Sequence, residues 1–133
     1  MAMLACCTAG LMVPNLSPYE GAIAATTTSS FDRLGKLLPL RKLGSAGPAV
    51  TNLGVGGAHV GSVSEKDAQA IIEKAVEEGV RFFDNAPFYS GGRAEERYGK
   101  FLTPKNRDDC FIMTKTKGGH SQRALKDLDN SLS

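Results

Sequence analysis

Apolar and polar positions over residues 39–133 repeat one arrangement three times. Short apolar runs, typical of strands, occupy residues 53–56, 80–83 and 110–114, and each is followed by a stretch whose apolar residues have helical spacing. The runs begin about one strand–helix–strand unit apart, which predicts parallel strands joined by right-handed helical crossovers. The fold class is therefore α/β. Residues that end the strands, and the loop at 56–61, are expected at one rim of the sheet.

The first helical stretch has start and stop signals. Ser64, with Asp67 three residues later, is typical of a helix N-terminus, and Gly79 is typical of a helix end. Two further helices are expected over residues 93–102 and from a Ser121 cap onward. The apolar positions expected on the buried face of the first helix are Ala68, Ile71, Ile72, Ala75 and Val76. Those expected on the inner face of the last helix are Ala124, Leu125, Leu128 and Leu132.

Two regions precede the first strand–helix repeat. Residues 39–54 contain two short alternating runs around the GSAG sequence at 44–47, which is typical of a β-hairpin. Residues 1–38 carry few charges and are expected to form a poorly ordered extension. A targeting segment within residues 1–37 is the alternative, although no Lys or Arg precedes its apolar stretch, as a secretory signal requires.

Composition narrows the functional classes. The 133-residue chain has a formal net charge of +2 with acidic and basic residues mixed, so no basic stripe favours nucleic acid binding. No apolar run reaches the ~20 residues that span a membrane. Its three cysteines fit neither a disulfide framework nor a metal site, and Cys110 and Tyr98 are interpreted as core residues. These features favour a reducing, cytoplasmic setting and no bound metal.

Residues that could carry chemistry follow the second and third predicted strands. Asp84 follows residues 80–83, Lys115 follows residues 110–114, and Tyr89 lies five residues past Asp84, within reach of the same rim. An ammonium close to a phenol stabilises the phenolate, which makes the phenol a better proton donor at neutral pH. From these residues alone, ordinary roles stay open, with Asp84 as a turn residue and Lys115 as a solvated surface lysine.

Three segments resemble the N-terminal part of the aldo-keto reductase family. RKLGSAGPAVTNLGVGG is similar to the family's opening hairpin and first barrel strand. VRFFDNAPFYSGGRAEERYGKFL is similar to its signature segment with an Asp and a Tyr, and DDCFIMTKTKGG to the strand that delivers a lysine. The resemblance covers residues 39–133. It implies a partial (β/α)8 TIM barrel, with an N-terminal β-hairpin and the first three β/α units, preceded by the extension at 1–38.

The resemblance also implies roles for these residues. Tyr89 would donate a proton to the carbonyl oxygen of an aldehyde or ketone, Lys115 would assist it, and Asp84 would pair with Lys115. The reaction would be hydride transfer from NADPH, with no metal. The positions that match residues lying against this cofactor are Gly56, Gly57, Ala58 and Asp84. The residues expected to line the pocket for a small-molecule carbonyl substrate are His59 and Phe88.

The chain departs from the family pattern toward its C-terminal end. The family's catalytic histidine, at the end of the fourth strand, has no counterpart before Ser133, and three of the eight β/α units of a closed barrel are present. We therefore expect a truncated portion of a reductase that is inactive alone and can self-associate through an open sheet edge. A non-catalytic cofactor-binding or regulatory subunit, or a fragment that pairs with a full-length partner, is the alternative.

Overall fold

The computed structural model of the chain describes residues 30–132, which contain a three-stranded parallel sheet. Its strands are β5 (Val55–Gly56), β6 (Phe82–Asp84) and β7 (Phe111–Met113), with β6 between the other two. Both neighbouring pairs are parallel, as the strand–helix repeats predict. The expected strands are confirmed, although each is shorter than its apolar run. Within the described residues, the outer edges of β5 and β7 have no partner strand.

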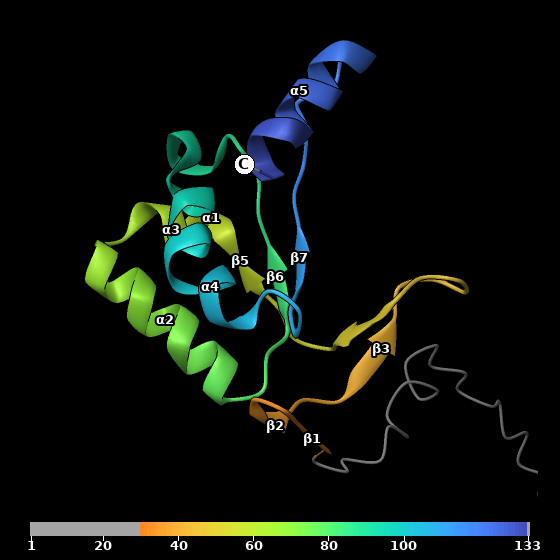
Figure 1. Cartoon of the computed structure of the whole chain (residues 1–133), viewed down its shortest axis with the longest axis vertical. Helices are drawn as coiled ribbons and strands as arrows, with labels where there is room; N and C mark the ends of the chain where they lie inside the picture. Colours follow the sequence, from red (N-terminus) through yellow and green to blue (C-terminus); the bar gives the residue numbers. More distant parts are fainter. Residues whose placement is uncertain (1–29, 133) are drawn as a thin grey trace, which may run out of the picture.

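Five α-helices accompany this sheet in the described part of the chain. They are α1 (Gly57–Ser62), α2 (Glu65–Glu77), α3 (Arg93–Phe101), α4 (Thr103–Asn106) and α5 (Ser121–Leu132). Figure 1 shows α1 to α4 on one side of the sheet, no helix on the other side, and α5 beyond one end. The loop expected at residues 56–61 is wrong, because α1 begins directly after β5. Helix α4 was not predicted from the sequence.

The hydrophobic core lies between the sheet and the helices on its covered side. In the parallel register Val55 pairs with Phe83, and Phe83 with Ile112, so these side chains share the covered face. Phe82 and Phe111 share the opposite face, where their ring centroids lie 5.8 Å apart. The buried residues of the core are Val60, Ala68, Ile72, Val80, Phe83, Tyr98, Leu102 and Cys110. The tyrosine and the cysteine are therefore confirmed as core residues.

The start and end signals of α2 act as the sequence predicts. The Ser64 hydroxyl accepts a hydrogen bond from the amide of Asp67 at 3.1 Å. Gly79, just past the helix, has a φ of +92°. A Cβ at Gly79 would also lie 2.8 Å from backbone atoms of residues 36 and 38, so both its conformation and its surroundings require glycine.

One face of α2 packs on the sheet as predicted, with one exception. Ala68 and Ile72 are fully buried, and Ala75 and Val76 pack against the core. The expected burial of Ile71 is wrong, since this side chain is 39% exposed. Ile71 lines an apolar groove beside the unpaired edge of β5, where no further strand covers it within residues 30–132.

Two antiparallel hairpins precede the sheet. β3 (Leu40–Lys42) pairs with β4 (Ala49–Thr51), which confirms the predicted hairpin. β1 (Ser30–Asp32) pairs with β2 (Gly35–Leu37), inside the stretch expected to be a poorly ordered extension. That part of the expectation is therefore wrong. The rest of the expected extension lies in residues 1–29, outside the described residues. The apolar stretch of the alternative targeting segment lies there too.

A buried arginine explains why the first hairpin forms part of the fold. The guanidinium of Arg81, a residue only 4% exposed, donates two hydrogen bonds to the carboxylate of Asp32, at 2.8 and 2.9 Å. It also donates to the carbonyl of Lys36 in β2 and to the carbonyls of Val76 and Val80. This bidentate pair links residues 49 positions apart, so no local pattern reveals it.

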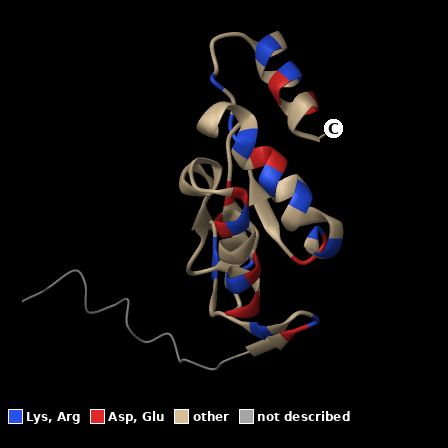
Figure 2. Cartoon of the chain, turned by 90° about the vertical axis from the view of Figure 1, so that its left-hand side faces the viewer, with Lys and Arg blue, Asp and Glu red and all other residues tan. Residues whose placement is uncertain are grey.

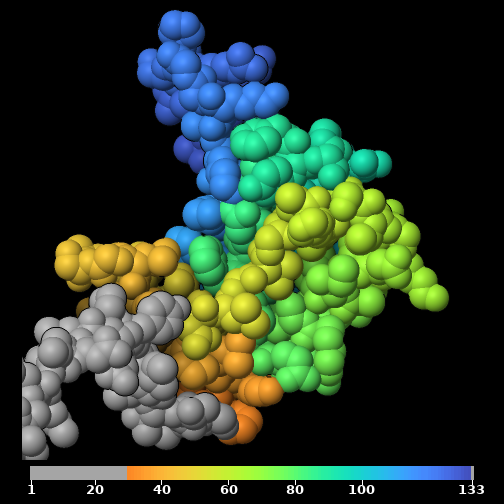
Figure 3. Space-filling view, turned by 180° about the vertical axis from the view of Figure 1, so that it is seen from behind, coloured from red at the N-terminus to blue at the C-terminus, as the bar shows by residue number. Residues whose placement is uncertain are grey.

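The last helix differs most from its prediction. Its expected inner face is largely exposed, with Leu125 at 61%, Leu128 at 44% and Leu132 at 70%. Figure 3 shows α5, in the deepest blue, projecting from the body of the molecule. One polar attachment is the Ser131 hydroxyl, which donates to Glu95 of α3 at 2.8 Å. The inner face is uncovered because the edge of β7 carries no further strand in the described residues for the helix to pack against.

Both acidic and basic residues lie along the helices. Figure 2 shows blue and red segments interspersed along them, in line with the near-neutral formal charge of the chain. Across residues 30–132, no helix combines the length and the apolar character that crossing a membrane would need.

The Asp32–Arg81 pair gives the first prediction. We expect Asp32→Ala to lower the free energy of unfolding by about 3 kcal/mol, because it leaves a buried guanidinium without its counter-charge. Hydrogen bonds from Arg81 hold the pKa of Asp32 below its ordinary value of 3.8, against the opposing effect of burial. The stabilisation is therefore present above that pH and is lost as the pH falls through the lowered pKa.

Urea unfolding of wild type and Asp32→Ala at pH 7 and at ~pH 2 measures this difference. The gap between the two proteins should shrink at the lower pH. Glu78→Ala is the matched control, because it removes exposed ion pairs with Lys36 and Lys74 and should change the stability much less. A gap of the same size at both pH values would contradict the assignment.

Candidate functional site

The candidate site lies where β6 and β7 end. Asp84 is the last residue of β6, and it pairs in register with Met113 of the neighbouring strand. Lys115 follows two residues after Met113, and Tyr89 begins the turn Tyr89–Gly92 that leads into α3. The parallel pairing of the two strands and the turn after β6 bring all three side chains to one rim, as the spacing predicts. We call these residues, Asp84, Tyr89 and Lys115, the Asp–Tyr–Lys cluster.

The ammonium of Lys115 holds the cluster together. Its Nζ donates hydrogen bonds to Asp84 Oδ1, to the phenol oxygen of Tyr89 at 2.9 Å and to the backbone carbonyl of Asn85 at 2.9 Å. These three acceptors match the three protons of an ammonium. The Tyr89 hydroxyl in turn donates to Asp84 Oδ2 at 3.3 Å. Each member of the cluster therefore contacts the other two.

The surroundings of the cluster favour a charged lysine. Burial of the ammonium acts to lower the pKa of Lys115, but the hydrogen bonds to Asp84 and Tyr89 outweigh it, and the pKa is raised above its ordinary value. The ammonium also lies 4.7 Å from the centroid of the Tyr89 ring, within the range of a cation–π contact. The side chains of Lys115 and Asp84 are 33% and 28% exposed, so the cluster is open to a small molecule.

Asn85 is a site residue that the sequence reasoning missed. Besides its carbonyl, which accepts from Lys115, its backbone amide donates to the carbonyl of Met113 at 2.7 Å. Asn85 is 4% exposed, and its side-chain Oδ1 is buried without a hydrogen-bond partner. Its position next to Asp84 at a strand end was the available signal, but nothing local indicates that its backbone would bind the lysine.

The other predicted site residues are placed differently from one another. Gly56 and Ala58 are exposed at the rim, and His59 is exposed on α1. Gly57 is buried against the end of β6. Phe88 is 38% exposed and contacts the Tyr89 ring edge-on, with centroids 5.4 Å apart. The structure thus places Phe88 against Tyr89 of the cluster.

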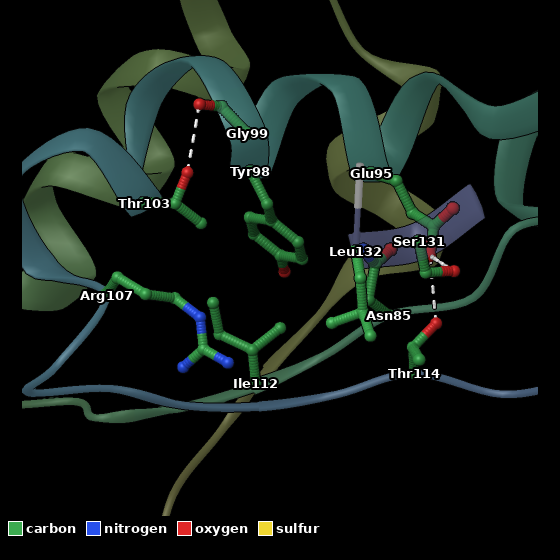
Figure 4. Close-up of a pocket in the computed structure, with 10 residues that line it drawn as sticks. All are labelled: Asn85, Glu95, Tyr98, Gly99, Thr103, Arg107, Ile112, Thr114, Ser131 and Leu132. Carbon is green, nitrogen blue, oxygen red and sulfur yellow. Dashed lines mark hydrogen bonds between the residues drawn. The ribbon is translucent and has the colours of Figure 1, made fainter. Parts of the chain in front are cut away.

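Two cavities lie near this region. The first, of about 410 Å³, lies between α3, α4, β7 and the end of α5. Figure 4 shows Arg107, Tyr98 and Ile112 pointing toward one another at one end of it, while Glu95 at the other end accepts hydrogen bonds from two hydroxyls. No member of the Asp–Tyr–Lys cluster lines this cavity. The second, of about 470 Å³, is lined by apolar residues of α5 and by Lys115, the one member of the cluster that borders it.

Among residues 30–132, no group of three or more His, Cys, Asp or Glu side chains is placed to hold a metal ion. The arrangement of the cluster, with a phenol between a carboxylate and an ammonium, is instead suited to moving a proton.

Comparison with known proteins places the chain in a family. The sequence model of the aldo/keto reductase family matches residues 52–133, more than half of the chain. D-threo-aldose 1-dehydrogenase of Pseudomonas sp is 41% identical over 75 residues, which cover 53% of this chain and 23% of that protein. L-galactose dehydrogenase of Arabidopsis thaliana is 36% identical over 107 residues, which cover 71% of this chain and 34% of that protein. The chain thus spans about a quarter to a third of the length of these relatives.

A solved structure agrees with the sequence comparison. The holo form of an aldo-keto reductase from Bacillus halodurans superposes with a TM-score of 0.63 at 25% identity, over 71% of this chain and 35% of that chain. This likeness confirms the expected fold, a partial (β/α)8 barrel with an N-terminal hairpin. On the family match and the structural likeness together, the chain belongs to the aldo/keto reductase family.

Proposed function

We propose that the Asp–Tyr–Lys cluster is the proton-transfer part of a site for NADPH-dependent reduction of a small aldehyde or ketone. The observation that carries this proposal is the shared ammonium, since Lys115 donates to both Asp84 and the phenol oxygen of Tyr89. Family membership supports the coarser activity, because aldo/keto reductases are oxidoreductases of carbonyl compounds.

Each residue of the cluster has a distinct task in this chemistry. The Tyr89 hydroxyl gives its proton to the carbonyl oxygen of the substrate as negative charge develops there. The phenolate left behind is stabilised by the Lys115 ammonium, which already donates to that oxygen at 2.9 Å. Asp84 accepts a hydrogen bond from the same ammonium and so keeps the lysine charged and oriented.

The rim of the sheet fits a nicotinamide cofactor. Gly56 is exposed beside the cluster, and a Cβ built there would meet no atom within 4 Å, so the rim is open at this point. Gly56 and Ala58 would border the nicotinamide, and Asp84 and Lys115 would present polar groups to it. NADPH, when bound, would supply the hydride that reduces the carbonyl carbon.

The relatives indicate which substrates to test first. Two of them are named for D-threo-aldoses and for L-galactose. Small hydroxylated carbonyl compounds are therefore the first candidates for this chain. Phe88, packed against Tyr89, would contact such a substrate.

Replacing the proposed proton donor tests the proposal. Because the chain spans 34% of L-galactose dehydrogenase, residues 39–133 can replace the matching segment of that protein to give a complete barrel. We expect this chimera to oxidise NADPH in the presence of an aldehyde, and Tyr89→Phe to lower kcat by ~100-fold or more through loss of general-acid catalysis. NADPH absorbance measures the rate, with NADH tested in parallel.

Tyr98→Phe is the matched control, because it also removes a phenol hydroxyl but from a buried residue outside the cluster. Its rate should stay within a few-fold of the unsubstituted chimera. Full activity in Tyr89→Phe would contradict the assignment of the donor, and binding of NADPH without turnover in the unsubstituted chimera would favour a regulatory subunit instead.

Removing the lysine charge gives a prediction with a defined pH dependence. Since the pKa of Lys115 is raised above 10.5, the lysine stays charged from ~pH 6 to 9. The wild-type rate should therefore show no change with pH in this range that comes from titration of Lys115. Lys115→Met should lower kcat by ~100-fold or more over this whole range. The stability that the ammonium contributes is present below pH 10.5 and is lost as the pH rises through the raised pKa.

Steady-state rates of the chimera and its Lys115→Met variant from ~pH 6 to 9 check this expectation. Lys117→Met is the control, because it removes a neighbouring lysine that lies over Phe88 and outside the cluster. A Lys115→Met variant that retains the rate of Lys117→Met would show that the ammonium has no part in the proton transfer.

A further inference from the structure

Helix α1 packs against both segments that carry the proton-transfer residues. Two of its residues, Gly57 and Gly61, are buried and lie four positions apart, so they share one face of the helix. Gly57 meets the end of β6 at Asp84, and Gly61 meets the turn at Ser90, the residue after Tyr89. The absence of a side chain at each glycine allows this close approach.

At Gly57 the contact is with the backbone of the cluster. A Cβ on Gly57 would lie 2.5 Å from the carbonyl oxygen of Asp84 and 3.2 Å from Asn85 Oδ1. The peptide between these two residues cannot give way freely, because its amide, that of Asn85, donates to the carbonyl of Met113 in β7 at 2.7 Å, and the carbonyl of Asn85 holds the Lys115 ammonium. Any side chain at Gly57 would therefore push the Asp84 carbonyl and, through the next residue, the lysine.

At Gly61 the contact is with a side chain in the tyrosine turn. A Cβ on Gly61 would lie 2.8 Å from Ser90 Oγ, 2.9 Å from Ser90 Cβ and 3.2 Å from the Cβ of Ala94 on α3. Ser90 has a φ of +53°, a left-handed conformation that glycine adopts more easily than serine. A side chain at Gly61 would displace this turn and move Tyr89 with it, while glycine at position 90 would remove the two shortest contacts and leave the one with Ala94.

The helix itself is fixed, so it cannot absorb such changes by moving away. Val60, between the two glycines, is 1% exposed in the core. The guanidinium of Arg97 on α3 donates to the carbonyls of Val60 and Val63, the latter at 2.7 Å, and so ties the C-terminal end of α1 to α3.

We propose that α1 positions the Asp–Tyr–Lys cluster, with Gly57 setting the place of Asp84 and Gly61 setting the place of Tyr89 around Lys115. Both glycines are positioning residues, and they act through their neighbours. The value of this arrangement for turnover depends on the proposed reductase function, but the placement of the three side chains can be tested without turnover.

The first experiment uses the 133-residue chain and nuclear magnetic resonance. The Lys115 ammonium lies 4.7 Å from the Tyr89 ring centroid, so the ring current should shift the ε-methylene protons of Lys115 away from the position of an unstacked lysine. We expect Gly61→Ala to move this signal toward the unstacked position. We expect the double variant Gly61→Ala/Ser90→Gly to move it most of the way back, because the second change removes both overlapping Ser90 atoms and leaves only the longer contact with Ala94.

The second substitution and a control sharpen this test. Gly57→Ala should also move the Lys115 signal, but Ser90→Gly should not restore it, because the overlap at Gly57 is with backbone atoms of β6. Gly99→Ala on α3 is the matched control, since a Cβ there would meet no atom within 4 Å, and it should leave the signal in place. Dispersed signals from core residues establish that each variant is folded.

Turnover in the chimera gives the functional readout. Gly61→Ala should lower kcat by ~10- to 100-fold with little change in KM for NADPH, and Ser90→Gly should recover most of the loss. The positioning role would be overturned if the Lys115 signal does not move in folded Gly61→Ala, or if adding Ser90→Gly does not move it back toward its wild-type position. If Gly57→Ala fails to fold, the comparison of Gly61→Ala with Gly61→Ala/Ser90→Gly decides alone. Failure of the proposed function would appear differently, as full activity in Tyr89→Phe with the Lys115 signal still sensitive to Gly61.

Discussion

The shared ammonium of Lys115 joins a carboxylate, a phenol and a peptide carbonyl at the end of two parallel strands. Much of the surrounding structure contributes to that contact. The register of β6 against β7 aligns the residues that precede Asp84 and Lys115, and the turn before α3 brings the Tyr89 ring back over the rim. α1 packs behind both segments, so the cluster is held from the helix-covered side and open on the other.

The features that the sequence predicted well are those with a local or periodic signal. The three strands, the hairpin around residues 44–47 and the cap of α2 each follow from neighbouring residue types. The meeting of Asp84 with Lys115 also follows, because parallel strands bring their carboxyl ends to one edge. The placement of Asp84 beside Lys115 therefore needed only the strand assignments, whereas that of Tyr89 also depends on the turn before α3.

The features that were missed depend on contacts between distant residues. The hairpin at residues 30–37 is held by Asp32 and Arg81, whose separation in sequence hides the pair. α1 is short and rich in glycine, a composition typical of a loop, and it is helical because its glycines fit against β6 and the tyrosine turn. The apolar face of α5 is exposed because, within the described residues, no further strand lies beside β7 for it to pack against. Helical periodicity predicts which face is apolar but not whether a strand is present to cover it.

The pKa of Lys115 in wild type and in Asp84→Asn tests the central claim most directly. Titration of the Lys115 ε-methylene signal by nuclear magnetic resonance measures both values. If the ammonium is shared as described, the wild-type pKa lies above 10.5, and it falls in Asp84→Asn because burial then acts without the compensating carboxylate. A wild-type pKa at or below 10.5 that Asp84→Asn leaves unchanged would contradict the account.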